Sequence, residues 1–145
     1  MPTELGKAFE LTWRGNPPHM LTPDIPVWYR FLEKYGPYFL ALYYDCLLGG
    51  PWLSQEQEKD PMQRMWRYNT AKRADAIAET GTETLIIEVA SYPGLRAVGQ
   101  LQVYRTLWRE DPKIDKPDKM LLVCERIDAD LAAACGIYGI QVYII

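Results

Sequence analysis

The sequence predicts an α/β fold with a mixed β-sheet, and three observations support this prediction. The stretch RADAIAETGTETLIIEVASYPG, from Arg73 to Gly94, consists of two short strand-like segments around a tight Gly81-Thr82 turn, which is typical of a β-hairpin. MLLVCERI, residues 120–127, is a continuous apolar run, as expected of a strand buried on both faces. Helical patterns separate the later strands, so the expected order from residue 64 is β, β, β, α, β, α, β.

The chain length suits one domain. The protein has 145 residues, of which 48% are hydrophobic, so a core of ordinary size can form. We expect a single domain over residues 1–145. It would comprise an aromatic-rich helical segment at 1–60 and an α/β core at 64–145.

The N-terminal segment carries signals for helices. Thr3 can cap a short helix that runs to about Leu11. In DIPVWYRFLEKYG, from residue 24, an aspartate, a proline and a glycine stand where a helix begins and ends. The next stretch, PYFLALYYDCLLGG at 37–50, repeats this pattern and is predicted as a second helix.

Eight aromatic rings are concentrated in these two predicted helices, and two interpretations remain open. The rings can pack against the sheet, or they can form a surface for a partner, because two short helices can hardly bury them all. The rings are those of Trp28, Tyr29, Phe31, Tyr35, Tyr38, Phe39, Tyr43 and Tyr44.

The remaining elements follow in order along the chain. Residues 54–63 are polar and predict a connector, and RMWRYNT predicts a first strand at 64–70. After the hairpin we expect a helix at 94–109, a charged loop at 109–119, a strand at 120–127, a helix at 128–136 and a last strand at 138–145.

Composition argues against several classes of function. The formal net charge is −3 and no basic tail or stripe is present, which disfavours extensive contact with a phosphate backbone, although a local basic patch remains open. Cys46, Cys124 and Cys135 form no CxxC pair and His19 is the only histidine, so neither a structural zinc site nor a Ser-His-Asp site is predicted. We expect three buried thiols in a reducing compartment.

The sequence also indicates where the protein works. The first residues, MPTELGK, lack the basic start and apolar run of a signal peptide, and YFLALYY is too short to span a bilayer. We therefore expect no membrane association, and a location in the cytoplasm or, for a viral protein, in the virion.

The hairpin brings two carboxylates together. With a two-residue Gly81-Thr82 loop, Asp75 lies opposite Glu88, with Cβ atoms about 5 Å apart. Like charges so close require a counter-charge, a shared proton or a metal ion, and a pair of carboxylates with room for water suits Mg²⁺ or Mn²⁺. The opposite face of the hairpin is apolar and has small side chains on one strand, which suits close packing against a helix.

Two further residues share one face of the following helix. Gln100 and Tyr104 are four residues apart, which places their side chains one above the other. Spacing alone favours a position at the surface or at the edge of the core for this pair.

Taken together, Asp75, Glu88, Gln100 and Tyr104 resemble the signature of the PD-(D/E)XK nuclease superfamily, in particular its RecB-like branch. That signature is an Asp on one strand, a Glu-x-Lys on the next and a Gln-x-x-x-Tyr on the following helix. Arg73, two residues before the aspartate, also matches that branch. The resemblance covers roughly residues 64–145 and implies a restriction-endonuclease-like mixed sheet flanked by helices. It further implies Mg²⁺ held by the two acidic residues.

The resemblance also implies an acidic residue on a helix before the sheet. Glu33 or Asp45 is the residue that we expect in this role.

The sequence departs from the family at one residue. The family's Glu-x-Lys is here Glu88-Val89-Ala90, and alanine can neither orient water nor stabilise charge on a phosphate. In the register above, Arg73 faces Ala90 and is the candidate charge substitute, forming ion pairs with Glu88 or Asp75. A permanently protonated arginine is a poor general base. We therefore interpret Asp75, Glu88, Gln100 and Tyr104 as the remnant of a catalytic site that needs no metal, or as an active site if Mg²⁺ binds.

Three functions follow from this interpretation. The first is a non-catalytic protein of nuclease fold that acts as a structural or assembly subunit of a larger, oligomeric complex, for example as a head–tail joining or tail-assembly protein of a viral particle. The second is a Mg²⁺-dependent DNA nuclease that uses Asp75 and Glu88. The third is a nucleic-acid-binding module that does not cleave, with contacts from Arg96, Arg105, Arg109, Lys113, Lys116 and Lys119.

Overall fold

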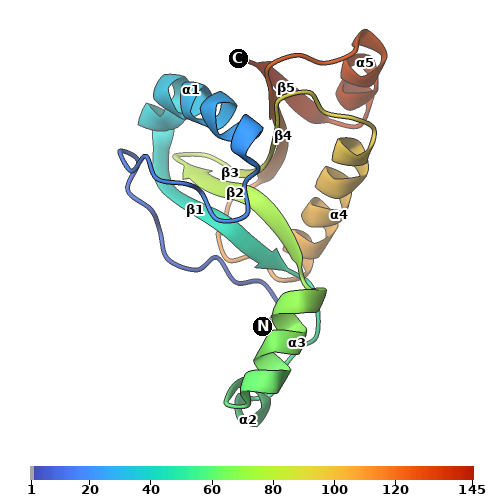
Figure 1. The fold of residues 1–145 in the computed structure, drawn as a ribbon. Coiled ribbons are helices and arrows are strands. Elements are labelled where there is room, and N and C mark those ends of the chain that lie inside the picture. The colour runs from blue at the N-terminus through green and yellow to red at the C-terminus, as the bar shows by residue number, and fades with distance from the viewer. Residues whose placement is uncertain (1) are drawn as a thin grey trace.

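A computed structural model describes residues 2–145 and places five strands in one mixed sheet (Figure 1). The order in the sheet follows the chain, β1-β2-β3-β4-β5. β2 runs antiparallel to both β1 and β3, whereas β4 runs parallel to β3 and β5 parallel to β4. The predicted α/β class and mixed sheet are thus confirmed. The strands are β1 (Phe39–Leu48), β2 (Lys72–Thr80), β3 (Thr84–Ala90), β4 (Asp118–Cys124) and β5 (Ile140–Ile144).

Helices cover both faces of this sheet (Figure 1). On one face α1 packs over the sheet through Val27, Trp28 and Phe31. On the other face α4 and α5 bury Leu101, Trp108, Leu131 and Cys135, among others. The described helices are α1 (Ile25–Tyr35), α2 (Gln55–Glu58), α3 (Pro61–Thr70), α4 (Arg96–Glu110) and α5 (Ala129–Ile137), with single 3₁₀ turns at Thr22–Asp24 and Gly36–Tyr38.

Most of the elements after residue 71 agree with the prediction. The hairpin strands, α4, β4, α5 and β5 all lie where expected, with ends that differ by a few residues. The small face of the hairpin packs as expected in part, because Ala76, Ala78 and Ile87 join the core beneath α1 whereas Ala74 joins the core beneath α4 and α5. These elements carry strong local signals, such as the turn glycine and the continuous apolar run of β4.

The helix predicted at 37–50 is wrong, because this stretch forms β1. Its residues pair with β2 over nearly the whole strand, and Leu42, Tyr44 and Cys46 are buried whereas the residues between them are only half-buried. Aromatic and aliphatic residues with a period of two fit a half-buried strand. Pro37 and Gly49 mark the ends of a strand here as well as they would mark those of a helix.

The strand predicted at 64–70 is also wrong, because these residues belong to α3. The Asp60 side chain accepts a hydrogen bond from the Met62 N–H at 3.0 Å and caps this helix, and Pro61 stands in its first turn. The preceding polar connector contains the short helix α2, capped by Ser54. In Figure 1, α2 and α3 protrude from one end of the sheet.

No helix forms at Thr3–Leu11, in contrast to the prediction. This segment is largely extended and runs along β1. Glu4 and Leu47 exchange backbone hydrogen bonds of 2.9 and 3.0 Å, and the Phe9 N–H donates to the Leu42 carbonyl at 2.8 Å. Tertiary pairing with the edge strand therefore replaces the local helical preference, and within residues 2–54 the one α-helix is α1.

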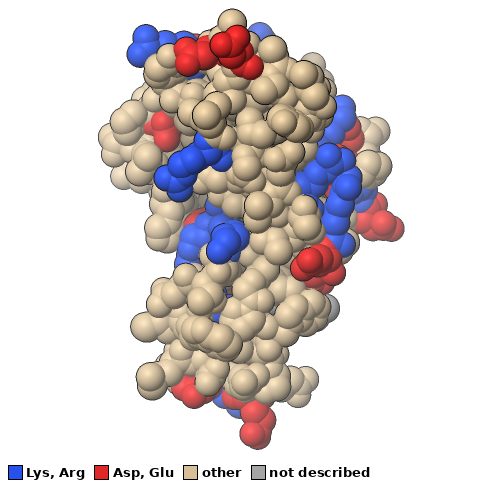
Figure 2. All heavy atoms as spheres, turned by 90° about the vertical axis from the view of Figure 1, so that its right-hand side faces the viewer, with Lys and Arg blue, Asp and Glu red and all other residues tan. Residues whose placement is uncertain are grey.

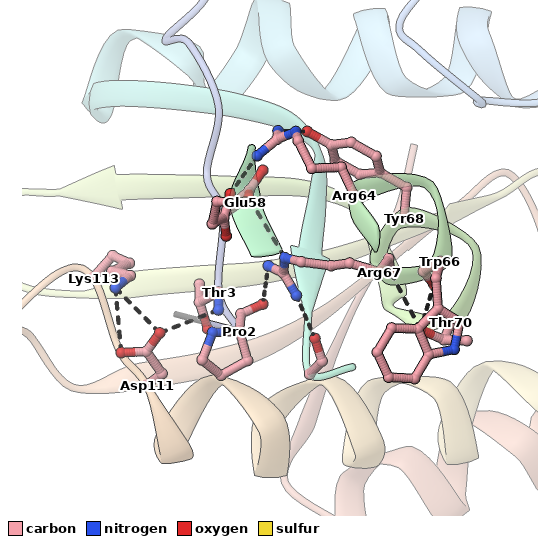
Figure 3. A network of polar contacts seen from close by, with 12 residues as sticks. Pro2, Thr3, Glu58, Arg64, Trp66, Arg67, Tyr68, Thr70, Asp111 and Lys113 are labelled. Atoms are coloured by element: carbon pink, nitrogen blue, oxygen red, sulfur yellow. Dashed lines mark hydrogen bonds and ion pairs between the residues drawn. The ribbon is translucent and has the colours of Figure 1, made fainter. Parts of the chain in front are cut away.

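A fully buried arginine attaches the N-terminal segment to α3 (Figure 3). The Arg67 guanidinium donates to the Pro2 carbonyl at 2.6 Å and to the Gly49 carbonyl at 3.0 Å. Beside it, the Thr3 N–H donates to the Asp111 carboxylate at 3.1 Å. Because these groups are buried, each bond satisfies a polar atom that has no access to water.

The N-terminal aromatic rings pack mainly into the core, which favours the first of the two interpretations. Four of the eight are buried, and the Trp28 indole N–H donates to the Tyr44 hydroxyl at 2.8 Å. Three more are partly buried and pack against the core. The buried four are Trp28, Phe31, Phe39 and Tyr44, and the partly buried three are Tyr29, Tyr35 and Tyr43. Tyr38 is the exception, with 71% of its surface exposed. The sheet supplies the apolar surface against which these rings are buried, which two isolated helices could not provide.

The prediction for the cysteines agrees with the structure. The three cysteines are free and buried, as expected. Within residues 2–145, no helix combines the length and the apolar character needed to cross a bilayer.

Candidate functional site

The predicted hairpin register is confirmed from Glu79–Thr84 to Ala76–Ile87. The ladder ends there, so the predicted pairs Asp75–Glu88 and Arg73–Ala90 lie beyond it. Ile77 pairs with Ile86, and Ala76 with Ile87. One residue further along, the Asp75 carboxylate accepts the hydrogen bond of the Val89 N–H at 2.8 Å. A side chain thus takes the place of a backbone acceptor, and Asp75 and Glu88 lie side by side at this end of the hairpin.

The two carboxyl groups lie close enough to influence each other's pKa, and the Tyr104 hydroxyl lies beside Glu88. Burial raises the pKa of Asp75, and burial together with the neighbouring Asp75 charge raises the pKa of Glu88 to about 9. At neutral pH, without a cation, Glu88 therefore holds the proton.

One oxygen of this pair has no partner. The buried Oε2 atom of Glu88 makes no hydrogen bond within the described residues. An unsatisfied buried acceptor costs about 1–3 kcal/mol, and the cost rises further when the group is charged. A cation next to Oε2 would remove this cost and allow both carboxyl groups to ionise. The residues present therefore fit a divalent metal ion.

The raised pKa of Glu88 predicts that the stability of the metal-free protein depends on pH. Because the pKa of folded Glu88 lies above the ordinary value of 4.5, its contribution to stability is fully present below that value and is lost as the pH rises toward about 9. We expect the unfolding temperature in a chelating buffer to fall over this range. The slope for one proton is at most about 1.4 kcal/mol per pH unit.

The Glu88→Gln variant is the control for this effect, because glutamine mimics the protonated acid. Thermal unfolding followed across the same pH series should show a flatter dependence for the variant. An unchanged slope in Glu88→Gln would contradict the assignment of the proton to this pair.

The acid pair lies in a pocket of about 520 Å³ between α4, β1–β3 and the segment that leads into α1. All five residues predicted for the site, namely Asp75, Glu88, Gln100, Tyr104 and Arg73, line it. Ala90 lines it as well, where the family resemblance places a lysine, and no lysine is among the described lining residues. The pocket also contains His19, Asp24, Asp45, Tyr92 and Arg96.

Asp24 is a site residue that the sequence did not reveal. It was predicted only as a helix cap, but its side chain makes no capping bond and its Oδ1 atom accepts the Ser91 N–H at 2.8 Å. The buried Asp24 thereby joins α1 to the loop after β3 and adds negative charge to the pocket. Glu33, which was expected on the pocket, is exposed and does not line it, whereas Asp45 does, from a strand rather than a helix.

The expected partner of Arg73 is wrong. Its guanidinium forms an ion pair with Asp45 at 2.8 Å and donates to the Tyr68 carbonyl at 3.1 Å. No ion pair links it to Asp75 or Glu88 in the described structure. Arg73 reaches Asp45 because β1, the strand that contains Asp45, pairs with β2 on the side away from β3. The sequence predicts a helix for the stretch that forms β1, and this contact is therefore not predicted. Arg73 therefore does not neutralise the acid pair.

The same Asp45 oxygen contacts His19. His19 Nδ1 lies 2.8 Å from Asp45 Oδ2, and both residues have left-handed backbones, with φ of 61° and 52°. The sequence offered no sign of this contact, because the two residues are 26 positions apart.

The proposed nucleic-acid contacts are mostly engaged by neighbouring acids. Arg105 and Arg109 both bind Asp118 at 2.8 Å. Lys113 pairs with Asp111, Lys116 with Glu79 and Lys119 with Glu83. Only Arg96 among the six faces the pocket. The charged loop thus resembles an ordinary solvated surface rather than a phosphate-binding stripe.

Two further searches give negative results. Across residues 2–145, no group of three or more His, Cys, Asp or Glu side chains stands close enough together to hold a metal ion. Comparison of the chain with family models, with curated proteins and with solved structures found no match.

Proposed function

We propose that this protein is a divalent-metal-dependent nuclease, and that Asp75 and Glu88 hold Mg²⁺ or Mn²⁺. The observation that carries the proposal is the buried carboxyl pair with an unpartnered oxygen, open to a pocket of about 520 Å³. Mg²⁺ is commonly bound through one or two carboxylates together with substrate phosphates. The resemblance of Asp75, Glu88, Gln100 and Tyr104 to the PD-(D/E)XK signature supports the same reaction.

Each side chain of the pocket has a role in this proposal. Asp75 is held by the Val89 N–H, so its carboxylate is oriented before a ligand arrives, and the Tyr104 hydroxyl lies beside Glu88. Arg96, at the first turn of α4, is the cation available for a phosphate group. A bound divalent ion would supply positive charge for the phosphate and activate water.

The location of Arg73 removes one argument for an inactive site. We expected Arg73 to neutralise the two acids, and it binds Asp45 instead. The other argument remains, because Ala90 stands where the family resemblance places a lysine. The acid pair is left with a proton that a metal ion can displace. Metal affinity should therefore rise with pH.

The test is a cleavage assay with the purified full chain. Single- and double-stranded DNA are incubated with Mn²⁺, with Mg²⁺ and with EDTA, and the products are resolved on a denaturing gel. We expect cleavage with either metal and none with EDTA. If no substrate is cut at any Mn²⁺ concentration that saturates the protein, the nuclease proposal fails. DNA binding without cleavage would indicate the non-cleaving module instead.

A second candidate, a subunit of a larger protein assembly, is favoured by the surface of α3. Met62, Met65 and Trp66 share one face of this helix and are 81%, 64% and 51% exposed, while Arg67 is the residue that turns inward. Figure 2 shows that the protruding lower end of the molecule is largely uncharged on the face turned to the viewer. Exposed apolar faces of this kind mark protein contacts. Sedimentation velocity on wild type and Trp66→Glu would test self-association through this face.

A further inference from the structure

We propose that His19, held by Asp45, accepts the proton of the attacking water in this pocket, an inference that rests on the nuclease function proposed above. The pocket needs such a group. No lysine lines it among the described residues, and Arg73 and Arg96 are too basic to release a proton readily. His19 is the one histidine of the chain, and its side chain stands at the pocket rim with 69% of its surface exposed.

The contact with Asp45 orients the imidazole for this task. Because a carboxylate only accepts, Nδ1 carries the hydrogen in the 2.8 Å contact with Asp45 Oδ2, and neutral His19 then has its lone pair on Nε2. Arg73 binds the same carboxylate oxygen at 2.8 Å and holds it in place. Asp45, itself only 14% exposed, thus positions the histidine, as the aspartate does in other His–Asp couples.

The backbone supports a functional role for the couple. His19 and Asp45 are the two non-glycine residues with positive φ in residues 2–145, and they contact each other from separate segments of the chain. Histidine and aspartate tolerate this conformation better than most residues, but it is uncommon and carries a cost. Such conformations persist where the surrounding structure holds them, and they are concentrated at functional sites.

The proposed step is a hydrolysis. The oxygen of a water molecule attacks the phosphorus of a phosphodiester, and its proton passes to Nε2 of His19. The bond from phosphorus to the leaving sugar oxygen breaks and its electron pair stays on that oxygen, which takes a proton from solvent.

Several charged groups face this site. They are Asp45 and Arg73 from the sheet, Asp24 before α1, Arg96 on α4 and the pair Asp75–Glu88.

The first experiment separates chemistry from metal binding. We expect His19→Ala and His19→Gln to lower kcat about 100-fold at saturating Mn²⁺, as is typical for loss of a general base, with KM and the Mn²⁺ affinity from calorimetry unchanged. Asn16→Ala, an exposed residue of the same segment outside the pocket, is the matched control and should behave as wild type. Added imidazole should restore part of the activity of His19→Ala.

Two further measurements test the role by other means. Long-range ¹⁵N–¹H spectra of the metal-free protein should show the Nδ1–H tautomer of His19, and Asp45→Ala should shift it toward Nε2–H. In the double variant His19→Ala/Ala90→Lys, a lysine is introduced near Glu88 in the same pocket, and we expect it to recover part of the activity.

The possible failures are distinct. If wild type cleaves and His19→Ala cleaves at the same rate, the role of His19 is overturned while the nuclease proposal stands. If His19→Ala loses Mn²⁺ affinity in proportion to activity, His19 is a metal ligand and not the proton acceptor. If wild type cleaves nothing, both proposals fail.

Discussion

Replacing Asp75 with asparagine is expected to lower the rate of metal-dependent cleavage by about 1000-fold or more. A metal ion contributes several kcal/mol to stabilisation of the transition state, and each 1.36 kcal/mol corresponds to a factor of ten. Asparagine keeps an oxygen that can accept the Val89 N–H, so the hairpin should remain intact. The lower cleavage rate of Asp75→Asn would then result from the lost negative charge and not from unfolding.

Glu33→Gln is the matched control, because it removes one carboxylate of α1 that does not line the pocket. It should leave both cleavage and Mn²⁺ affinity unchanged, whereas Asp75→Asn should weaken Mn²⁺ binding in calorimetry. Equal activity of Asp75→Asn and wild type would show that any cleavage observed arises elsewhere or from a contaminant.

Replacing Arg67 with alanine is expected to destabilise the protein by about 3 kcal/mol. The guanidinium is 1% exposed and binds the carbonyls of Pro2 and Gly49, which would lose their partners in a buried space (Figure 3). For a chain of this length the change corresponds to a drop of about 10 °C in the unfolding temperature. Thermal unfolding followed by circular dichroism measures it.

Arg64→Ala, on the same helix, is the control for the loss of an arginine. Arg64 is solvent-accessible and pairs with Glu58 at the surface, so its removal should change the unfolding temperature little. If Arg67→Ala and Arg64→Ala unfold at the same temperature, the N-terminal segment is not held by the buried network.

Local signals were sufficient to predict the hairpin and its register. The Gly81-Thr82 turn determines which residues face each other, and the alternation of side chains then places Asp75 beside Glu88. The pattern of α4 likewise placed Gln100 and Tyr104 on one face, and both line the pocket. The residues concerned lie within about 30 positions of one another, so local sequence patterns are enough to predict how they are placed.

Segments with ambiguous local signals were assigned incorrectly. The stretch that forms β1 carries proline and glycine at its ends and aromatic residues throughout, which fits a helix or a strand until a partner strand is known. The stretch that forms α3 has β-favouring aromatic residues, but Asp60 caps it as a helix and Arg67 anchors it. In both cases tertiary pairing outweighed propensity.

The sequence by itself determined the hairpin, the acid pair and the absence of a lysine at Ala90. Only the tertiary structure decided what surrounds that pair. Arg73 binds Asp45 because β1 lies on the other side of β2 from β3. Asp24 and His19 reach the pocket because the segment leading into α1 crosses the end of the sheet where β2 and β3 separate. Contacts between residues 26 to 67 positions apart in the sequence depend on how the layers of the fold pack, and no local sequence pattern predicts them.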